Sequence, residues 1–341
     1  MDALIGKTPE ELKALAKDLG LPAFTGGQLA RWLYVRRAVS LDEMTDISKA
    51  GRELLAQHYT VGTLRPSLTL TSRDGTEKYL FDVGATEDGA MGGIEAVMIP
   101  DQDRNTLCVS SQAGCKMGCK FCMTGRQGFH GNLTAAEILG QILSVDRIHP
   151  LSNIVFMGMG EPLDDWPEVR RAIDVLTAPW GFAWSPKRIT LSTIGVMPRL
   201  REFLDESRCH LAVSLHNPFP QERLEMMKVE KAWPVTEIVR LIKQYDFTGQ
   251  RRVSFEYTMF AGWNDTPRHA AALARLLRGL ECRVNLIRFH RIPDFPYGTS
   301  SEKTMTAFRD MLTDAGVTCT IRASRGEDIL AACGMLAGQK Q

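Results

Sequence analysis

The spacing of apolar residues divides the chain into a helical start, a hairpin and a long run of alternating strands and helices. Over the first 60 residues the apolar positions recur every three or four residues, as expected of helices that bury one face. Thr8, Pro9 and Glu11 form a helix-start signal in which the Thr and Glu side chains cap each other's backbone N–H. Further helices are expected from Thr25, over 41–44 and over 48–58.

The next stretch alternates between apolar and polar residues, which is typical of strands with one buried face. Strands over residues 68–71 and 79–83, joined by the turn Arg73-Asp74-Gly75, predict a β-hairpin. A further strand is expected over 94–100. Glu95 lies in this otherwise apolar strand, where a lone carboxylate is expected to point to solvent.

From about residue 105, apolar strands alternate with amphipathic helices. Strands are expected over 107–111, 154–157, 188–193, 211–215, 253–259, 283–289 and 317–321, with helices over 134–148, 168–176, 197–204, 235–245, 267–277 and 301–314. This alternation implies parallel βαβ units. About six units predict an α/β fold, an incomplete (β/α)6 barrel with its site at the carboxyl ends of the strands. The expected domains are a helical domain over 1–60, a β-hairpin extension over 61–104 and the partial barrel over 105–341.

Three cysteines follow the first barrel strand within eight residues. Cys115, Cys119 and Cys122 have the spacing Cys-x3-Cys-x2-Cys. A structural zinc site has four protein ligands, whereas three thiolates on a four-iron cluster leave one iron free for another molecule. Such an iron can chelate S-adenosylmethionine (SAM) and pass it the electron that breaks a carbon–sulfur bond. Zinc and a disulfide scaffold are the alternatives, although disulfide scaffolds belong to short secreted chains.

The composition indicates an ordinary globular protein. The chain has 341 residues, of which 44% are hydrophobic and 24% charged, enough for one full α/β domain and a smaller appendage. Its longest apolar run, residues 329–337, is too short to span a bilayer. We expect no secretory signal, because no basic segment followed by an apolar core stands at the start. Eight cysteines in such a chain suggest reduced thiols and a cytoplasmic location.

The net charge of +1 does not by itself indicate nucleic-acid binding. The arginines are clustered, however, and clusters permit RNA binding through local patches. The same clusters could be ordinary solvated side chains. Nothing in the N-terminal helices looks catalytic, so their arginines are expected to grip RNA phosphates. The clusters comprise Arg31, Arg36, Arg37, Arg251, Arg252, Arg283, Arg288, Arg291, Arg322 and Arg325.

From about residue 5 to the C-terminus, the chain resembles the radical SAM RNA methyltransferases of the RlmN/Cfr type. The cysteine motif alone indicates a radical enzyme, and the outlying pair Cys108 and Cys333 indicates this family. The other matching motifs are Thr106 to Cys115, Gly158-Met-Gly160-Glu161-Pro162, Leu191-Ser-Thr193, Ser214-Leu-His216, Pro296-Tyr-Gly298 and Arg325 to Gly334.

The resemblance implies a two-stage reaction that uses a 4Fe-4S cluster and two SAM molecules per turnover. Cys333 first takes a methyl group from one SAM, for which it must be a thiolate. An adenosyl radical from the second SAM then removes hydrogen from that methyl group, and the methylene radical attacks an adenine carbon in RNA. Cys108 releases the product by forming a disulfide with Cys333, and Glu95 matches the family's proton acceptor. Without the surrounding motifs, both cysteines would be read as small buried hydrophobes.

The resemblance also implies the contacts to SAM. Gly160 and Glu161 match residues that meet its amino group, and Ser192 matches one at its ribose or carboxylate. The ribose and adenine side matches Ser214, Leu215 and His216. The family usually has Asn where this chain has His290, which can also donate and accept a hydrogen bond. The remaining cysteines match no family site and are expected in the core: Cys209, Cys282 and Cys319.

The implied function is methylation of adenine C2 in 23S rRNA at the peptidyl-transferase centre, and in some tRNAs beside the anticodon. Two alternatives are the C8-directed branch of the family, which shares the cysteines and the cluster, and a zinc-stabilised RNA-binding protein without catalysis. The implied partners are 23S rRNA, tRNA and an electron donor such as flavodoxin. No membrane partner is expected, and the protein is expected to be a monomer.

Overall fold

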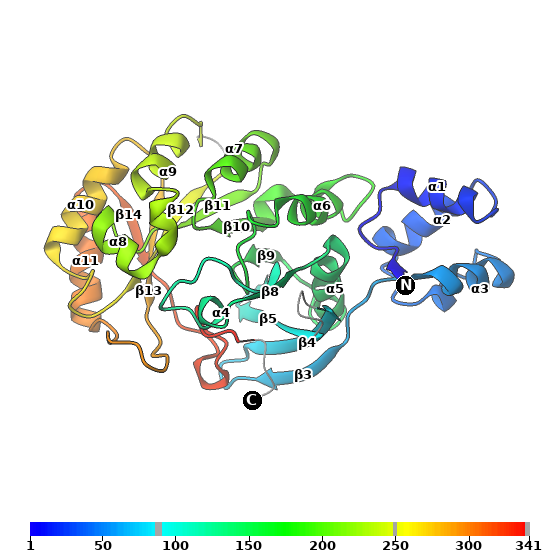
Figure 1. The fold of residues 1–341 in the computed structure, drawn as a ribbon, viewed down its shortest axis with the longest axis horizontal. Helices are drawn as coiled ribbons and strands as arrows, with labels where there is room; N and C mark the ends of the chain where they lie inside the picture. Colours follow the sequence, from blue (N-terminus) through cyan, green and yellow to red (C-terminus); the bar gives the residue numbers. More distant parts are fainter. Residues whose placement is uncertain (86–90, 248–250, 338–341) are drawn as a thin grey trace.

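The computed structural model describes residues 1–85, 91–247 and 251–337. A small helical lobe stands beside a larger lobe built on one curved sheet (Figure 1). The small lobe contains α1 (Pro9–Asp18), α2 (Thr25–Ala30) and α3 (Lys49–His58), with a π-helical turn η1 (Arg31–Val35) and the 3-10 turn η2 (Leu41–Glu43) between them. The short parallel strands β1 (Asp2–Ala3) and β2 (Tyr59–Thr60) join its two ends. The expected helical start is thus confirmed, down to the capping box of Thr8 and Glu11.

The helical lobe packs against the outside of the barrel through aromatic rings and ion pairs. The Tyr34 ring meets the edge of Trp180 with ring centres 5.4 Å apart. Arg37 pairs with Asp146 on α5 and lies over the Phe182 ring. Arg37 therefore holds the lobes together, which separates it from the RNA-facing role expected for this arginine cluster.

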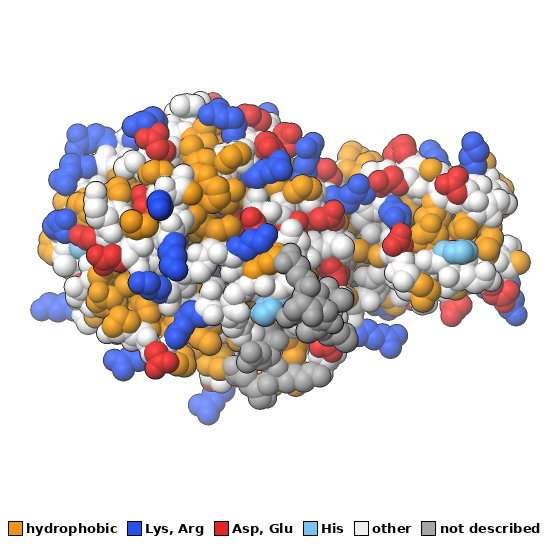
Figure 2. Space-filling view, viewed as in Figure 1, with side chains coloured by type: hydrophobic (Ala, Val, Ile, Leu, Met, Phe, Trp, Pro, Cys, Tyr) orange, Lys and Arg blue, Asp and Glu red, His pale blue; other side chains and the backbone are white. Residues whose placement is uncertain are grey.

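The two other arginines of that cluster lie at the surface. Arg31 pairs with Asp46, and Arg36 stacks over the Trp32 ring with its guanidinium carbon 4.3 Å from the ring centre. Basic and acidic side chains are interspersed on the face of the helical lobe seen in Figure 2. The lobe therefore offers individual arginines to a partner, and this face carries no patch of one charge.

The sheet of the larger lobe has ten strands in the order β14-β13-β12-β11-β10-β9-β6-β5-β4-β3. Pairing is parallel from β14 to β6 and antiparallel from β6 to β3. The parallel strands are β6 (Arg104–Cys108), β9 (Asn153–Phe156), β10 (Ile189–Thr193), β11 (His210–Ser214), β12 (Val253–Met259), β13 (Arg283–Arg288) and β14 (Thr318–Ile321). The antiparallel strands are β3 (Pro66–Thr71), β4 (Glu77–Ala85) and β5 (Met91–Asp101). The expected partial barrel and hairpin are confirmed.

Helices connect the parallel strands on the outside of the barrel (Figure 1). They are α5 (Ala135–Asp146), α6 (Trp166–Thr177), α7 (Met197–Glu206), α8 (Pro220–Met226), α9 (Val235–Ile242), α10 (Pro267–Leu277) and α11 (Glu302–Asp314). Short elements that the periodicity did not predict are α4 (Met123–Arg126), β7 (Gln112–Gly114), β8 (Phe129–Asn132), α8 and the turns η3 (Pro186–Arg188), η4 (Lys228–Lys231) and η5 (Glu327–Ile329). Such pieces are too short to show a period.

The hairpin belongs to the same sheet as the barrel, because β5 pairs with β6. Lys78, Val97 and Cys108 lie in one cross-strand row, and Leu80 pairs with Glu95 in the next row. Since side chains alternate between the faces of a sheet, Lys78, Glu95 and Cys108 share one face. Glu95 is only 2% exposed, so the expectation of a solvent-facing carboxylate was wrong. The physical reason is that the end of the chain covers this face.

Residues 322–337, called here the C-terminal segment, follow β14 and turn back over the hairpin and α4 (Figure 1). At its start, the Gly326 N–H donates to Asp74 in the hairpin turn at 3.0 Å. Near its end, the Thr124 hydroxyl of α4 donates to the Leu336 carbonyl at 2.7 Å. These two anchors place Cys333 between the hairpin and the cysteine loop.

In the described part of the chain, helices are too short or too polar to cross a membrane.

Candidate active site at the carboxyl ends of the barrel strands

One cavity opens where the parallel strands end. It encloses about 980 Å³, part of it open to solvent, which is the size of pockets that hold small-molecule ligands. Its wall combines the three motif cysteines, the loops after the barrel strands and the C-terminal segment. The polar and thiol residues in this wall are Cys115, Cys119, Cys122, Thr124, Glu161, Ser192, Thr193, Ser214, His216, Glu256, Thr258, Arg322 and Cys333.

The three motif cysteines line one wall of this cavity. Cys115 follows β7, where its N–H donates to the Gly128 carbonyl at 2.7 Å and closes the loop. A Cβ at Gly114 would lie 2.1 Å from the same carbonyl oxygen, so only glycine fits there. Burial raises the pKa of all three thiols, that of Cys115 to about 12. Iron binds the thiolate form, so loading the site must release protons.

The donor set fits an iron–sulfur cluster. Three thiols and no fourth protein ligand are the set that leaves one iron of a 4Fe-4S cluster open. Within the described residues, no three His, Cys, Asp or Glu side chains meet closely enough around one point to hold a single metal ion. The thiols of Cys115, Cys119 and Cys122 share a cavity instead, which suits a cluster of several atoms better than one zinc ion.

Glu161 presents a buried carboxylate beside the cysteines. Gly160 has φ +98°, and a Cβ there would lie 2.6 Å from the Gln112 side chain, so the turn requires glycine. The Glu161 carboxylate accepts hydrogen bonds from the Thr193 hydroxyl at 2.6 Å and the Ile194 N–H at 2.9 Å. Burial still raises the pKa of Glu161 to about 7. The site therefore favours a neighbouring cation, and the amino group of SAM is one.

His216 is held in one orientation on the opposite side of the cavity. It has φ +56° and is 6% exposed. The Thr258 N–H donates to its Nδ1 at 3.0 Å, so the neutral ring carries its proton on Nε2. Burial lowers the pKa of His216 to about 3, and the nearby Arg223 lowers it further. His216 is therefore neutral at physiological pH and can donate from Nε2.

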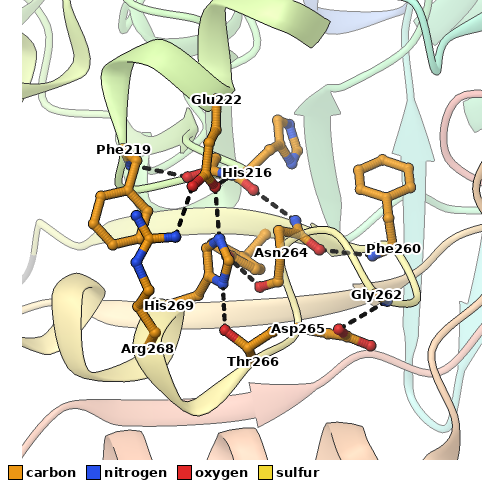
Figure 3. A network of polar contacts seen from close by, with 12 residues as sticks. His216, Phe219, Glu222, Phe260, Gly262, Asn264, Asp265, Thr266, Arg268 and His269 are labelled. Carbon is orange, nitrogen blue, oxygen red and sulfur yellow. Dashed lines mark hydrogen bonds and ion pairs between the residues drawn. The ribbon is translucent and has the colours of Figure 1, made fainter.

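A polar network behind the cavity fixes the backbone of His216 (Figure 3). The Asn264 amide donates to the His216 carbonyl at 2.7 Å and accepts from the Phe260 N–H at 2.7 Å. Glu222 ties the same loop to α10, since its carboxylate lies 2.7 Å from His269 Nε2 and 2.8 Å from Arg268 Nη1. Asn264 and Glu222 were missed from the sequence, because a single Asn or Glu in a loop carries no pattern that distinguishes it.

Two expected cofactor contacts lie elsewhere. The Leu215 side chain is fully buried in the core, so only its backbone remains near the site. His290 lines a neighbouring cavity, with Nδ1 3.2 Å from Glu327 and Nε2 3.1 Å from the Ser324 hydroxyl. It is engaged with the C-terminal segment, which the sequence gave no means to foresee. Ser192 and Ser214 both line the cofactor cavity.

The outlying cysteines are neighbours and both are free thiols. Cys108 is 8% exposed, and burial raises its pKa to about 12, with a further contribution from Cys333. Cys333 is exposed and lines the cofactor cavity. Arg322 lies beside both: burial lowers its pKa, but Cys333, Glu256 and Cys108 together raise it. The sequence placed Arg322 in a cluster of arginines without assigning it to the site.

Glu95 lies on the wall behind the C-terminal segment. Lys78 Nζ is 2.9 Å from Oε1 of Glu95, and the Ala337 N–H donates to Oε2 at 2.7 Å. Lys78 was also missed, because the alternation of β4 predicts a solvent-facing side chain at its position.

Comparisons with known proteins agree with this geometry. Residues 109–274 match the radical SAM superfamily, and residues 3–61 match the ribosomal RNA large subunit methyltransferase N-terminal domain. A probable dual-specificity RNA methyltransferase RlmN of Porphyromonas gingivalis is 58% identical over 99% of this chain and 97% of its own length. The dual-specificity RNA methyltransferase RlmN of Syntrophus aciditrophicus is 40% identical over 97% of this chain and 94% of its own length.

The fold comparison points the same way. The crystal structure of a radical SAM methyltransferase from Sphaerobacter thermophilus superposes with a TM-score of 0.93 at 37% identity, covering 99% of this chain and all of that one. The resemblance inferred from the motifs is confirmed. The chain belongs to the RlmN family of radical SAM RNA methyltransferases.

Proposed function

We propose that this protein methylates C2 of a specific adenosine in 23S rRNA at the peptidyl-transferase centre, and of the adenosine next to the anticodon in some tRNAs. The observation that carries the proposal is the shared cavity of the three motif cysteines, Glu161 and Cys333, with Cys108 beside it. A member of this family uses a 4Fe-4S cluster and SAM. When bound, these groups supply the methyl group and the radical chemistry that activates it.

The chain's own residues bind and orient the cofactors. Cys115, Cys119 and Cys122 hold the cluster as thiolates. Glu161 receives the amino group of SAM, because its buried carboxylate gains most from a neighbouring cation. The hydroxyls of Ser192 and Ser214 and the Nε2–H of His216 face the same cavity and suit the ribose and adenine of SAM.

The surroundings of the two outlying cysteines suit different roles. Cys333 is exposed in the cavity and beside Arg322, which favours its thiolate and makes it the methyl acceptor. Cys108 is buried and protonated, so it stays unreactive until the product must be released. The Cys108 thiolate then attacks the Cys333 sulfur: an S–S bond forms and the C–S bond to the nucleotide breaks. The electron pair leaves with that carbon, which takes a proton to become methyl.

Glu95 accepts the proton that the attacked adenine carbon must lose. The C–H bond breaks, an O–H bond forms on the carboxylate, and the electron pair of the C–H bond stays with the base. A general base needs a fixed orientation, and the contacts of Glu95 to Lys78 and Ala337 supply it. The first turnover also needs one electron, for which a flavodoxin-like donor is proposed, and the disulfide must be reduced before the next.

The relatives favour this function over the alternatives. They are named dual-specificity RNA methyltransferases RlmN, which supports two RNA classes and the C2 branch over the C8 branch. A zinc-stabilised RNA-binding protein would have no use for the buried carboxylate of Glu161 or for Cys333 in the same cavity.

Mass spectrometry of RNA digests tests the proposal directly. Cells lacking the gene should lose 2-methyladenosine from 23S rRNA and tRNA, and the wild-type gene should restore it while Cys333→Ala should not. Restoration of 8-methyladenosine instead would assign the C8 branch. Anaerobically purified protein should contain about four irons per chain, and stoichiometric zinc without iron would overturn the radical chemistry.

A further inference from the structure

We propose that Lys78 is a positioning residue that holds Glu95 as an ionised, oriented carboxylate, ready to accept a proton. The inference rests on the proposed function, in which Glu95 is the proton acceptor. Lys78 Nζ lies 2.9 Å from Glu95 Oε1, and the two side chains are 5% and 2% exposed. A buried charged pair of this kind is costly to assemble and marks a place where the charge is used.

The sheet register brings these two side chains together. Lys78 on β4 is opposite Val97 on β5, and Glu95 is two residues before Val97. Glu95 and Val97 therefore point to the same face, and Lys78 reaches Glu95 along the diagonal. Cys108 on β6 is opposite Val97 on the other side. The base and the resolving cysteine are thus one row apart on one wall.

The C-terminal segment completes the surroundings of the pair. The Ala337 N–H donates to Glu95 Oε2 at 2.7 Å, and the Leu330 carbonyl lies 3.5 Å from Lys78 Nζ. Lys78 therefore contacts both Glu95 and the segment that carries Cys333. Loss of the ammonium would disturb the charge of the base and one contact of this segment, and the two effects need separate readouts.

A buried carboxylate without a cation would take up a proton more easily. Removal from water disfavours the charged form, whereas an ammonium within hydrogen-bonding distance favours it. The single N–H donor of Ala337 compensates only part of that cost. A protonated Glu95 cannot accept a proton from adenine, so the ammonium decides over which pH range the base works.

The other titratable groups near this wall do not replace Lys78. Cys108 on β6 shares the face of Glu95, and Cys333 and Arg322 of the C-terminal segment interact with Cys108. A thiolate at either cysteine would disfavour the ionised carboxylate, and Arg322 pairs with Glu256 at 3.4 Å. The neighbouring strand β7 consists of Gln112, Ala113 and Gly114, which carry no titratable side chain.

Single-turnover kinetics of the full chain with bound cluster test this role. The protein is premethylated at Cys333 and mixed with RNA, SAM and reductant, and release of methylated RNA is followed between pH 6 and pH 9. In Lys78→Met the acidic limb of the profile should move up by about one pH unit or more, so that high pH restores release. Lys78→Arg keeps a cation and should stay closer to the wild type.

The double variant Lys78→Met/Glu95→Gln separates tuning of the base from structural damage. If Lys78 acts through Glu95, the double variant should release RNA as slowly as Glu95→Gln alone, at every pH. The surface pair of Lys49 and Glu53 on α3 supplies the control: Lys49→Met also removes a paired lysine and should leave the profile unchanged. Methylation of Cys333 and cleavage of SAM should survive in all these variants.

A uniform loss of release in Lys78→Met, with the acidic limb unmoved, would overturn the inference and leave Lys78 a purely structural role. If Lys78→Met does not fold, Lys78→Arg decides, since an additive loss when it is combined with Glu95→Gln would also refute coupling. Wild-type protein that releases no methylated RNA would instead refute the proposed function, so the two failures are distinguishable.

Discussion

The helical lobe and the hairpin both precede the barrel, yet they relate to the site in opposite ways. The lobe packs its helices on the outside of the barrel, and none of its described residues lines the cofactor cavity. The hairpin strands β3 to β5 extend the barrel sheet itself through the pairing of β5 with β6. They bring Lys78 and Glu95 to the same face as Cys108.

The difference shows how the manner of attachment decides what an added region can contribute. Strand pairing imposes a register, and the register sends every second side chain of the new strand onto a wall that the barrel already owns. A docked helix uses its apolar stripe for the contact and turns its polar face away. The hairpin is therefore suited to chemistry and the lobe to binding, and the following predictions test that division from the largest effect to the smallest.

The largest effects are expected at the two outlying cysteines. Cys333→Ala should abolish both methylated protein and RNA product, because the acceptor is gone. Cys108→Ala should still allow attack on RNA, but RNA should accumulate covalently on Cys333, since no second sulfur can release it. Denaturing gels of protein with labelled RNA distinguish the two. Equal behaviour of the variants, with no RNA-linked protein from either, would refute the assigned roles.

The next largest effect is expected on RNA binding by the helical lobe. Arg31→Ala/Arg36→Ala should weaken RNA binding about tenfold at physiological salt and lower the salt slope by about one per lost phosphate contact. Cleavage of SAM in the absence of RNA should be unchanged. Filter binding at several salt concentrations measures this, and Lys49→Met is the matched control on the same lobe. Unchanged affinity in the double variant would give these arginines another role.

A smaller effect is expected where the lobe meets the barrel. Arg37→Ala removes the partner of Asp146, whose side chain is 6% exposed, and should cost about 1–3 kcal/mol in the free energy of unfolding. The chemical steps should keep their rates at a temperature where the protein stays folded. Denaturant unfolding and single-turnover assays give the two numbers. A loss of chemistry without a loss of stability would contradict a docking role.

The smallest effect at neutral pH is expected at the hairpin turn. Burial acts to raise the pKa of Asp74, but hydrogen bonds from the Thr76 and Gly326 N–H groups outweigh it and lower the pKa to about 2. Because this folded pKa lies below the ordinary value of 3.8, the anchor is fully present above about pH 4 and is lost as the pH falls toward 2. Limited proteolysis should therefore open the C-terminal segment only in acid.

Asp74→Asn keeps an acceptor oxygen without a titrating group, so it serves as the control. Its C-terminal segment should show the same protease sensitivity at pH 5 and at pH 2.5, apart from any change in protease activity, which an unrelated substrate corrects. Equal acid sensitivity in wild type and variant would show that another group controls this segment.

The sequence by itself determined the fold class, the order of strands and helices and the cofactor loop. These features follow from local signals: apolar periodicity, the capping boxes of Thr8 and Thr134, which both form, and the close spacing of Cys115, Cys119 and Cys122. Motifs near one strand end, such as Gly160-Glu161, also placed their residues in the cavity, because parallel strands end at one edge.

Only the tertiary structure decided the contacts between segments that are distant in the chain. Glu95 alone looked like a surface carboxylate, and it is buried because residues 322–337 return across the hairpin and cover it. His290 turned to this same segment instead of the cofactor, and Lys78 became the partner of Glu95 through strand register. Side-chain burial and pairing depend on what packs against a strand, and no local pattern encodes a neighbour that lies hundreds of residues away.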